Sequence, residues 1–284
     1  KSMSLIDKAI QLANKEEIHN RIAKFVDGKG LIFKFMGQLD EALKMHEKAL
    51  SLSREINDKH GIRQYLNNTG LIYEERASFE KAMEIYAECL KLSKQMNEKR
   101  SICVSYCNIG YILNFQGALK QALKYFKRAH NLAIEIDYKA GIGGYANNMA
   151  QIYIKQNEFK KAITLLNSAK DILNDLGIAD SVSCVVGKAF CYMKLGNLNA
   201  LNNEIKIIKK SINKNENYED YTALYQLFEI YKFLNDIDSS KIYIKKAYEL
   251  LLNRIDKIDD SHEKKNFKNT YDAQNILTNI NTTN

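Results

Sequence analysis

The residue types that most often carry chemistry are present in this chain, but they do not group at catalytic or metal-binding spacing. Cys103 and Cys107 are one helical turn apart and could in principle bind a metal or sense oxidation. No Cys-X-X-Cys motif and no nearby histidine supports either role, so packing of small residues is the favoured interpretation. The five histidines are scattered: His19, His46, His60, His130 and His262. We therefore expect no catalytic residues, no metal site and no cofactor.

One glycine-rich stretch, Gly141-Ile142-Gly143-Gly144, resembles a phosphate-binding loop in composition alone. Such loops follow a strand and continue into Gly-Lys-Ser or Gly-Lys-Thr. This stretch instead follows the end of an expected helix and lacks that motif. We interpret it as the loose start of another helix, and we do not expect the chain to be an enzyme.

The composition favours a helical protein outside the membrane. There is no proline, and no run of 18 apolar residues exists that could span a bilayer. The first four residues lack the apolar core of a secretory signal. An odd number of cysteines, five, favours reduced thiols and hence a cytoplasmic setting.

The net charge of +8 is unevenly distributed. Residues 91–140 contain nine Lys or Arg against three acidic residues. A solvated face is the first interpretation, and an acidic protein surface as partner is the second. Nucleic acid is disfavoured because aromatic residues do not alternate with the basic ones.

A 40-residue period organises the chain. Gly30, Gly70 and Gly110 are spaced by 40, and Ala150 continues the series. Two further series of small residues keep the same spacing: Ala42, Ala82, Ala122 and Ala162, and Ala49, Cys89, Ala129 and Ala169. A fixed period of this length indicates a stack of one supersecondary unit, here two helices that cross closely at small residues.

The units follow one another along the chain. The first comprises helices over 22–36 and 39–56, and the next three cover about 61–97, 101–137 and 141–177. The period then shortens to 39 for repeats five and six. We expect a solenoid of about six repeats over 1–262 with an N-terminal half-repeat helix at 3–14, a capping helix at 263–280 and a tail at 281–284.

These units resemble tetratricopeptide repeats (TPRs) of the 40-residue variety. Repeat two shows the pattern through Gly70, Tyr73, Ala77, Ala82, Tyr86 and Cys89. The resemblance covers roughly residues 3–250. Within the family, the sequence is similar to Leu-Gly-Asn-repeat adaptors, kinesin light chains and bacterial Rap-type peptide receptors. It implies an all-α, right-handed superhelical solenoid of stacked antiparallel helix pairs, whose first helices line a concave groove.

By that resemblance, the groove would hold a partner segment. Asn68, Asn108 and Asn148 form a ladder at the 40-residue spacing, and a carboxamide can pair with a peptide backbone whatever its side chains. Apolar pockets would come from Leu31, Leu71, Tyr111 and Phe115, and charge selection from Lys34, Lys155, Glu74 and Glu75. The remaining groove residues would be Asn67, Cys107, Asn114, Asn147 and Gln151.

The expected function is therefore a non-enzymatic scaffold that captures a protein or peptide, which could be acidic. Two alternatives remain open at this point. The chain could be the sensory or regulatory region of a larger signalling protein, or, less favoured, a helical repeat that binds nucleic acid.

Overall fold

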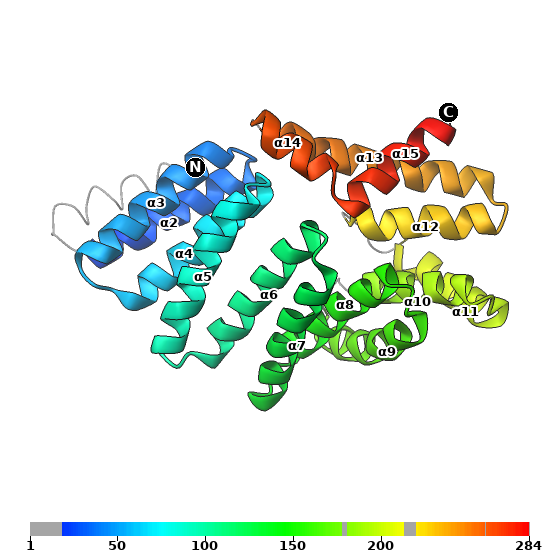
Figure 1. Cartoon of the computed structure of the whole chain (residues 1–284), viewed down its shortest axis with the longest axis horizontal. Coiled ribbons are helices and arrows are strands. Elements are labelled where there is room, and N and C mark those ends of the chain that lie inside the picture. The colour runs from blue at the N-terminus through cyan, green and yellow to red at the C-terminus, as the bar shows by residue number, and fades with distance from the viewer. Residues whose placement is uncertain (1–18, 178–180, 213–219, 259, 284) are drawn as a thin grey trace. The chain divides into compact units, whose positions relative to one another are not determined.

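The computed structural model describes residues 19–177, 181–212, 220–258 and 260–283. The half-repeat helix expected at 3–14 lies outside these residues. Within them, every regular element is an α-helix, and 14 helices are present (Figure 1). None of these helices is long and apolar enough to cross a membrane. The all-α solenoid of helix pairs is confirmed.

Six antiparallel pairs of helices follow one another. The first four pairs are α2 (His19–Phe35) with α3 (Leu39–Glu55), α4 (Lys59–Glu75) with α5 (Phe79–Gln95), α6 (Lys99–Phe115) with α7 (Leu119–Glu135), and α8 (Lys139–Lys155) with α9 (Phe159–Asp175). The last two pairs are α10 (Ser181–Lys194) with α11 (Leu198–Ile212), and α12 (Tyr221–Phe233) with α13 (Ile237–Asp256). The bounds follow the expected repeats within a few residues.

The turns between helices share one geometry. The helices α2 to α9 are each 17 residues long and begin 20 residues apart. Each is followed by a residue in the left-handed region, which is Gly, Asn or Asp except at Ala77, where φ is 59°. There the Ser78 amide donates to the Tyr73 carbonyl at 2.9 Å and the Ala77 amide to the Glu74 carbonyl at 3.0 Å. These bonds satisfy carbonyls that the helix end leaves free.

The small-residue series marks where the two helices of a pair cross. A Cβ atom at Gly70 would lie 2.5 Å from Cε1 of Tyr86, and one at Gly30 would lie 2.7 Å from Cε1 of His46. Both large side chains are fully buried. The close crossing of helices at small residues is therefore confirmed at these two positions.

The chain divides into two compact units. Unit 1 contains α2 to α5, most of α6 and residues 257–266, and unit 2 contains α7 to α13 and the chain from Phe267 onward. Each has its own apolar core. Buried Ile22, Val26, Tyr65 and Leu66 belong to the core of unit 1, and Leu166, Leu173 and Cys191 to that of unit 2.

The segment expected as one capping helix over 263–280 is two helices, α14 (Ser261–Lys268) and α15 (Tyr271–Thr283). The break falls at Asn269 and Thr270, and the Gln274 amide donates to the Thr270 carbonyl at 3.0 Å. Thr270 thus stands at the N-cap position of α15, where its hydroxyl oxygen is buried and caps no backbone N–H of the described residues. The α15 helix packs against α13 and includes residues 281–283, which we had expected to be tail.

Candidate functional site

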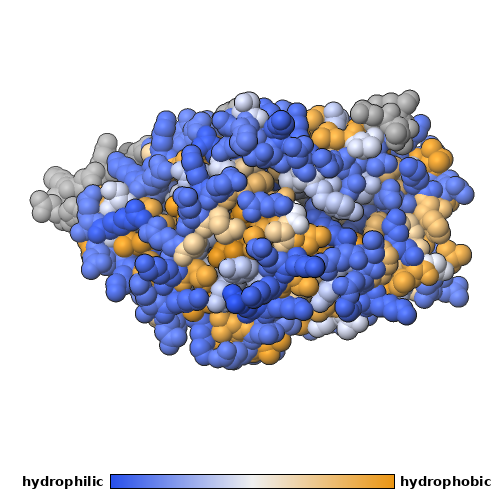
Figure 2. All heavy atoms as spheres, viewed as in Figure 1, coloured by the Kyte–Doolittle hydropathy of each residue, from blue (hydrophilic) through white to orange (hydrophobic). Residues whose placement is uncertain are grey.

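In unit 1, the first helices α2, α4 and α6 carry an apolar row in register. Leu31, Leu71 and Tyr111 are spaced by 40 residues, and Leu31 is 47% exposed while the other two are half-buried. One turn earlier on each helix lie Asp27, Asn67 and Cys107. Side chains four apart lie on the same helix face, so polar and apolar rows run side by side. On the face drawn in Figure 2, apolar patches likewise interrupt a mostly hydrophilic surface.

The asparagines of unit 1 connect successive repeats. The Asn68 Nδ2 atom donates to Oδ1 of Asp27 at 2.9 Å, and the Asn108 Nδ2 atom donates to Oδ1 of Asn67 at 3.0 Å. In both cases the bond reaches 41 residues back, to the preceding first helix. Sequence reasoning assigned these carboxamides to a ligand alone, whereas each already holds two repeats together. Asn68 is half-buried, whereas Asn108 is only 9% exposed.

A buried pair that sequence reasoning missed lies behind this ladder. The Nδ1 atom of His46 is 2.7 Å from Oδ1 of Asp27, and neither side chain is more than 4% exposed. Oδ2 of Asp27 also accepts from Nε2 of Gln64 at 3.2 Å. A signal was present, because both residues depart from the repeat pattern within one repeat. Asp27 stands where Asn67 stands in the next repeat, and His46 stands where Tyr86 does.

The charged groove residues of unit 1 are paired with one another. Nζ of Lys34 lies 3.9 Å from Glu75, and Nζ of Lys257 lies 3.6 Å from the same carboxylate. Glu74 accepts a hydrogen bond from the Tyr86 hydroxyl at 3.0 Å. These contacts therefore contribute to holding unit 1 together.

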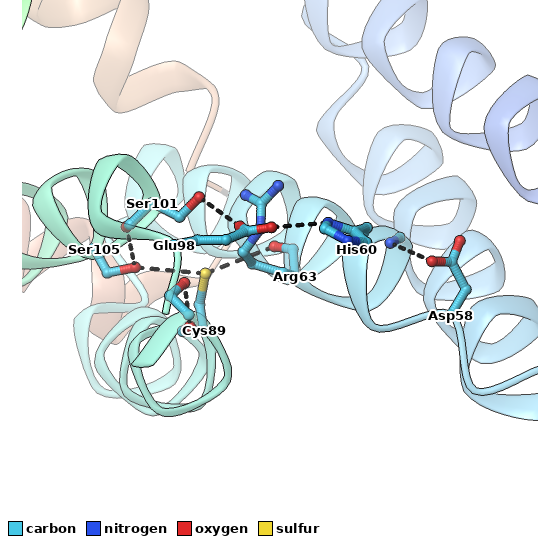
Figure 3. Close-up of polar contacts among 9 residues, drawn as sticks. Asp58, His60, Arg63, Cys89, Glu98, Ser101 and Ser105 are labelled. Atoms are coloured by element: carbon cyan, nitrogen blue, oxygen red, sulfur yellow. Dashed lines mark hydrogen bonds and ion pairs between the residues drawn. The ribbon is translucent and has the colours of Figure 1, made fainter. Parts of the chain in front are cut away.

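A pocket of about 280 Å³ lies between α4 and α6 in unit 1, with Cys89 of α5 in its wall. Asn67 is the one member of the expected groove set that lines it. The other lining residues are Arg63, Gln64, Cys89, Arg100, Ser101, Val104 and Ser105. Figure 3 shows Glu98 beside this pocket, bound to Nδ1 of His60 at 2.8 Å and to Nε of Arg63 at 2.7 Å.

In unit 2, the expected groove residues contact the C-terminal part of the chain. Nζ of Lys155 lies 2.9 Å from Oδ2 of Asp272 on α15 and donates to Oδ1 of Asn114 at 3.1 Å. The Lys155 side chain is 8% exposed and that of Asp272 is 16% exposed. The Phe115 ring lies 6.5 Å from the Phe267 ring and 5.0 Å from the Arg254 guanidinium.

The other expected residues of unit 2 contact neighbouring first helices. Oε1 of Gln151 accepts from Nε2 of Gln226 on α12 at 3.0 Å, and Oδ1 of Asn147 accepts from the Cys184 thiol at 3.6 Å. Asn148 is half-buried on α8. A pocket of about 160 Å³ lies here, lined by residues of α8, α10 and α12 together with Tyr271, Asp272 and Asn275 of α15. The C-terminal helix therefore covers part of the first-helix face of unit 2.

The sequence matches a known family model over more than half of its length. Residues 29–203 match the model described as MalT-like TPR region, and residues 221–250 match a tetratricopeptide repeat model. No curated protein matches the sequence.

Solved structures with this fold share little sequence with it. The apo form of RapI is 16% identical, with a TM-score of 0.71 over 90% of this chain and 99% of RapI. BtubC from P. vanneervenii is 17% identical, with a TM-score of 0.67 over 76% and 90%. A Rap protein complexed with competence and sporulation factor is 13% identical, with a TM-score of 0.63 over 99% and 81%. The likeness shows a TPR fold, and the match over residues 29–203 shows that the chain belongs to the family of MalT-like TPR regions.

Proposed function

We propose that this chain is a non-enzymatic scaffold that binds a protein or peptide segment along the first-helix face of unit 1. The observation that carries the proposal is the pair of rows on α2, α4 and α6. One row is apolar and partly exposed, and one helical turn away the half-buried Asn67 offers a hydrogen-bonding carboxamide between the buried Asp27 and Cys107.

The two rows can contact both the side chains and the backbone of an extended segment. Apolar side chains of the segment would be buried against Leu31, Leu71 and Tyr111, at about 25 cal/mol for each Å² removed from water. Its backbone N–H and C=O groups would pair with the free positions of Asn67 and Asn68, which accept or donate irrespective of the partner's side chains. A Rap protein of similar fold was solved in complex with competence and sporulation factor, which supports a binding role for this fold.

The test is selection of random 12-residue peptides displayed on phage against the immobilised full chain. Affinities of selected peptides are then measured by fluorescence anisotropy for the wild type, Leu31→Lys and Leu176→Lys. The two leucines are matched, at 47% and 46% exposure, and Leu176 caps α9 in unit 2.

We expect Leu31→Lys to weaken binding about tenfold or more, because it places a charge in the apolar row. Leu176→Lys should bind like the wild type. Failure to select any peptide, or equal loss in both variants, would refute the first-helix face of unit 1 as the binding surface.

A further inference from the structure

We propose that the pocket between α4 and α6 in unit 1 binds an oxyanion, a carboxylate or a phosphate, that the partner segment carries. The pocket wall contains two guanidinium groups, two carboxamides, two hydroxyls and a thiol, and it contains no carboxylate. A site with this set of donors and this charge is complementary to an anion.

Arg63 supplies a fixed pair of donors. Its Nε atom lies 2.7 Å from Oε2 of Glu98 in an ion pair, and the same carboxylate oxygen accepts a hydrogen bond from the Ser101 hydroxyl at 2.9 Å. Figure 3 shows the guanidinium extending beyond this contact, and within the described chain its two terminal nitrogens have no hydrogen-bond partner. A planar fork held in this way can bind an oxyanion through two parallel N–H groups.

Asn67 is oriented by the neighbouring repeat. Its Oδ1 accepts from Asn108, so its Nδ2 must point to the other side of the carboxamide plane. Asn67 lines the pocket, and its Nδ2 therefore adds an N–H donor there. The bond between repeats thus has a second effect, because it fixes which end of the amide is available for a ligand.

The remaining lining residues add positive potential, and the nearest carboxylate, that of Glu98, lies behind Arg63 and Ser101 rather than in the wall. Arg100 is exposed and lines the pocket from the first turn of α6, where the helix dipole also favours an anion. Cys89 is buried beneath, and burial raises the pKa of its thiol, which stays neutral at pH 7. The Ser105 hydroxyl lies 3.6 Å from that sulfur and donates to the Ser101 carbonyl at 3.0 Å.

A purely structural role for Arg63 would need only its contact with Glu98. That role does not account for a set of lining residues that contains no carboxylate. Pocket chemistry elsewhere in the molecule differs, since the pocket at Leu50 and Thr69 in unit 1 contains Glu47 as well as Arg54. Arg54 therefore provides a matched control, being an arginine of the same unit whose NH2 nitrogen pairs with Glu88 at 2.7 Å.

The experiment titrates the ¹⁵N-labelled full chain at constant ionic strength with three probes: inorganic phosphate, N-acetyl-glutamate α-amide and its neutral glutamine analogue. Saturable shifts of amides in α4 and α6 are expected with at least one anion and not with the neutral analogue. Arg63→Gln and Arg100→Gln should each weaken anion binding about tenfold, whereas Arg54→Gln should bind as the wild type does.

The probes also identify the source of the oxyanion. Preference for phosphate supports a phosphorylated partner, and preference for the glutamate derivative supports an acidic one. Unchanged binding in both Arg63→Gln and Arg100→Gln, or equal shifts with the neutral analogue, would overturn the pocket. Arg100 is exposed, so its variant remains informative if Arg63→Gln unfolds.

Only the origin of the anion rests on the proposed function. If anions bind but no displayed peptide does, the pocket stands and the peptide proposal fails. If peptides bind with equal affinity to the two pocket variants, the proposed function stands and the oxyanion inference fails.

Discussion

The two units use polar side chains on their first helices in opposite ways. In unit 1, Asn108 and Glu98 hold Asn67 and Arg63 in place, and donors of both remain at a pocket. In unit 2, Lys155 is already bound by Asp272 of α15, and the pocket beside it contains both signs of charge. The same kind of helix face thus keeps oriented donors at a pocket in unit 1, whereas α15 partly covers it in unit 2.

The comparison teaches that repeat position alone does not assign a ligand-binding role. Lys155 and Asn114 occupy groove positions by the repeat pattern, yet both contact other parts of their own unit. A residue at a groove position can bind a ligand only where its neighbours fix the orientation of its side chain and leave some of its hydrogen-bonding groups without a partner. Three pairs of variants test how the two units are held together, and they are described from the largest expected effect to the smallest.

Asp272→Ala should lower the free energy of unfolding by about 3 kcal/mol, because it removes one partner of a largely buried ion pair. Glu158→Ala removes the partner of Lys161 in an exposed pair, and it should lower the free energy of unfolding far less than Asp272→Ala. Urea denaturation of both variants measures the difference. Equal costs would mean that α15 does not hold the first-helix face of unit 2.

Gly70→Ala and Gly144→Ala form a matched pair with opposite expected signs. A Cβ atom at Gly70 meets the Tyr86 ring at 2.5 Å, so the change should destabilise by about 1–3 kcal/mol. At Gly144 nothing lies within 4 Å, and Ala should stabilise α8 by about 0.5–1 kcal/mol. Thermal melting of the two variants gives the sign of each stability change. A stabilising effect of Gly70→Ala would show that α4 and α5 can separate freely.

Asn108→Ala should have the smallest effect. It loses the bond to Asn67, about 0.5–1.5 kcal/mol, while Ala gains part of this back through helix propensity. Asn167→Ala, at an exposed position in α9, isolates the propensity gain. The difference between the two variants in urea denaturation should equal one hydrogen bond. No difference would indicate that the ladder does not connect the repeats in solution.

The packing of this fold was predictable from the sequence because it follows the 40-residue period. The helices of a pair were expected to cross at Gly70, and a Cβ atom there would indeed meet the Tyr86 ring at 2.5 Å. Arg63 and Arg100 were missed because the period carries no information about residues that occur once. Residues one period from Arg63 and Arg100 are Cys103 and His60, so neither arginine forms a series. The break of the C-terminal helix at Thr270 was also missed, since a single capping residue is a weak signal within an apolar pattern.

The partners of the polar side chains could not be predicted for a geometric reason. Asn108 bonds to a residue 41 positions back, and that offset depends on how one first helix is rotated against the next. Spacing in the sequence shows which residues are equivalent but not which of their neighbours they reach. The covering of Lys155 by α15 likewise joins residues 117 positions apart.

A residue in the left-handed region follows each helix from α2 to α9. This common turn affects how repeats can be gained or lost in evolution. Turns within a pair and turns between pairs span the same number of residues and close through the same kind of backbone bonds. A gene duplication or loss of 40 residues, wherever its ends fall in this part of the chain, would therefore restore complete helices and an unaltered junction. The number of pairs can then vary in evolution without new turns having to arise.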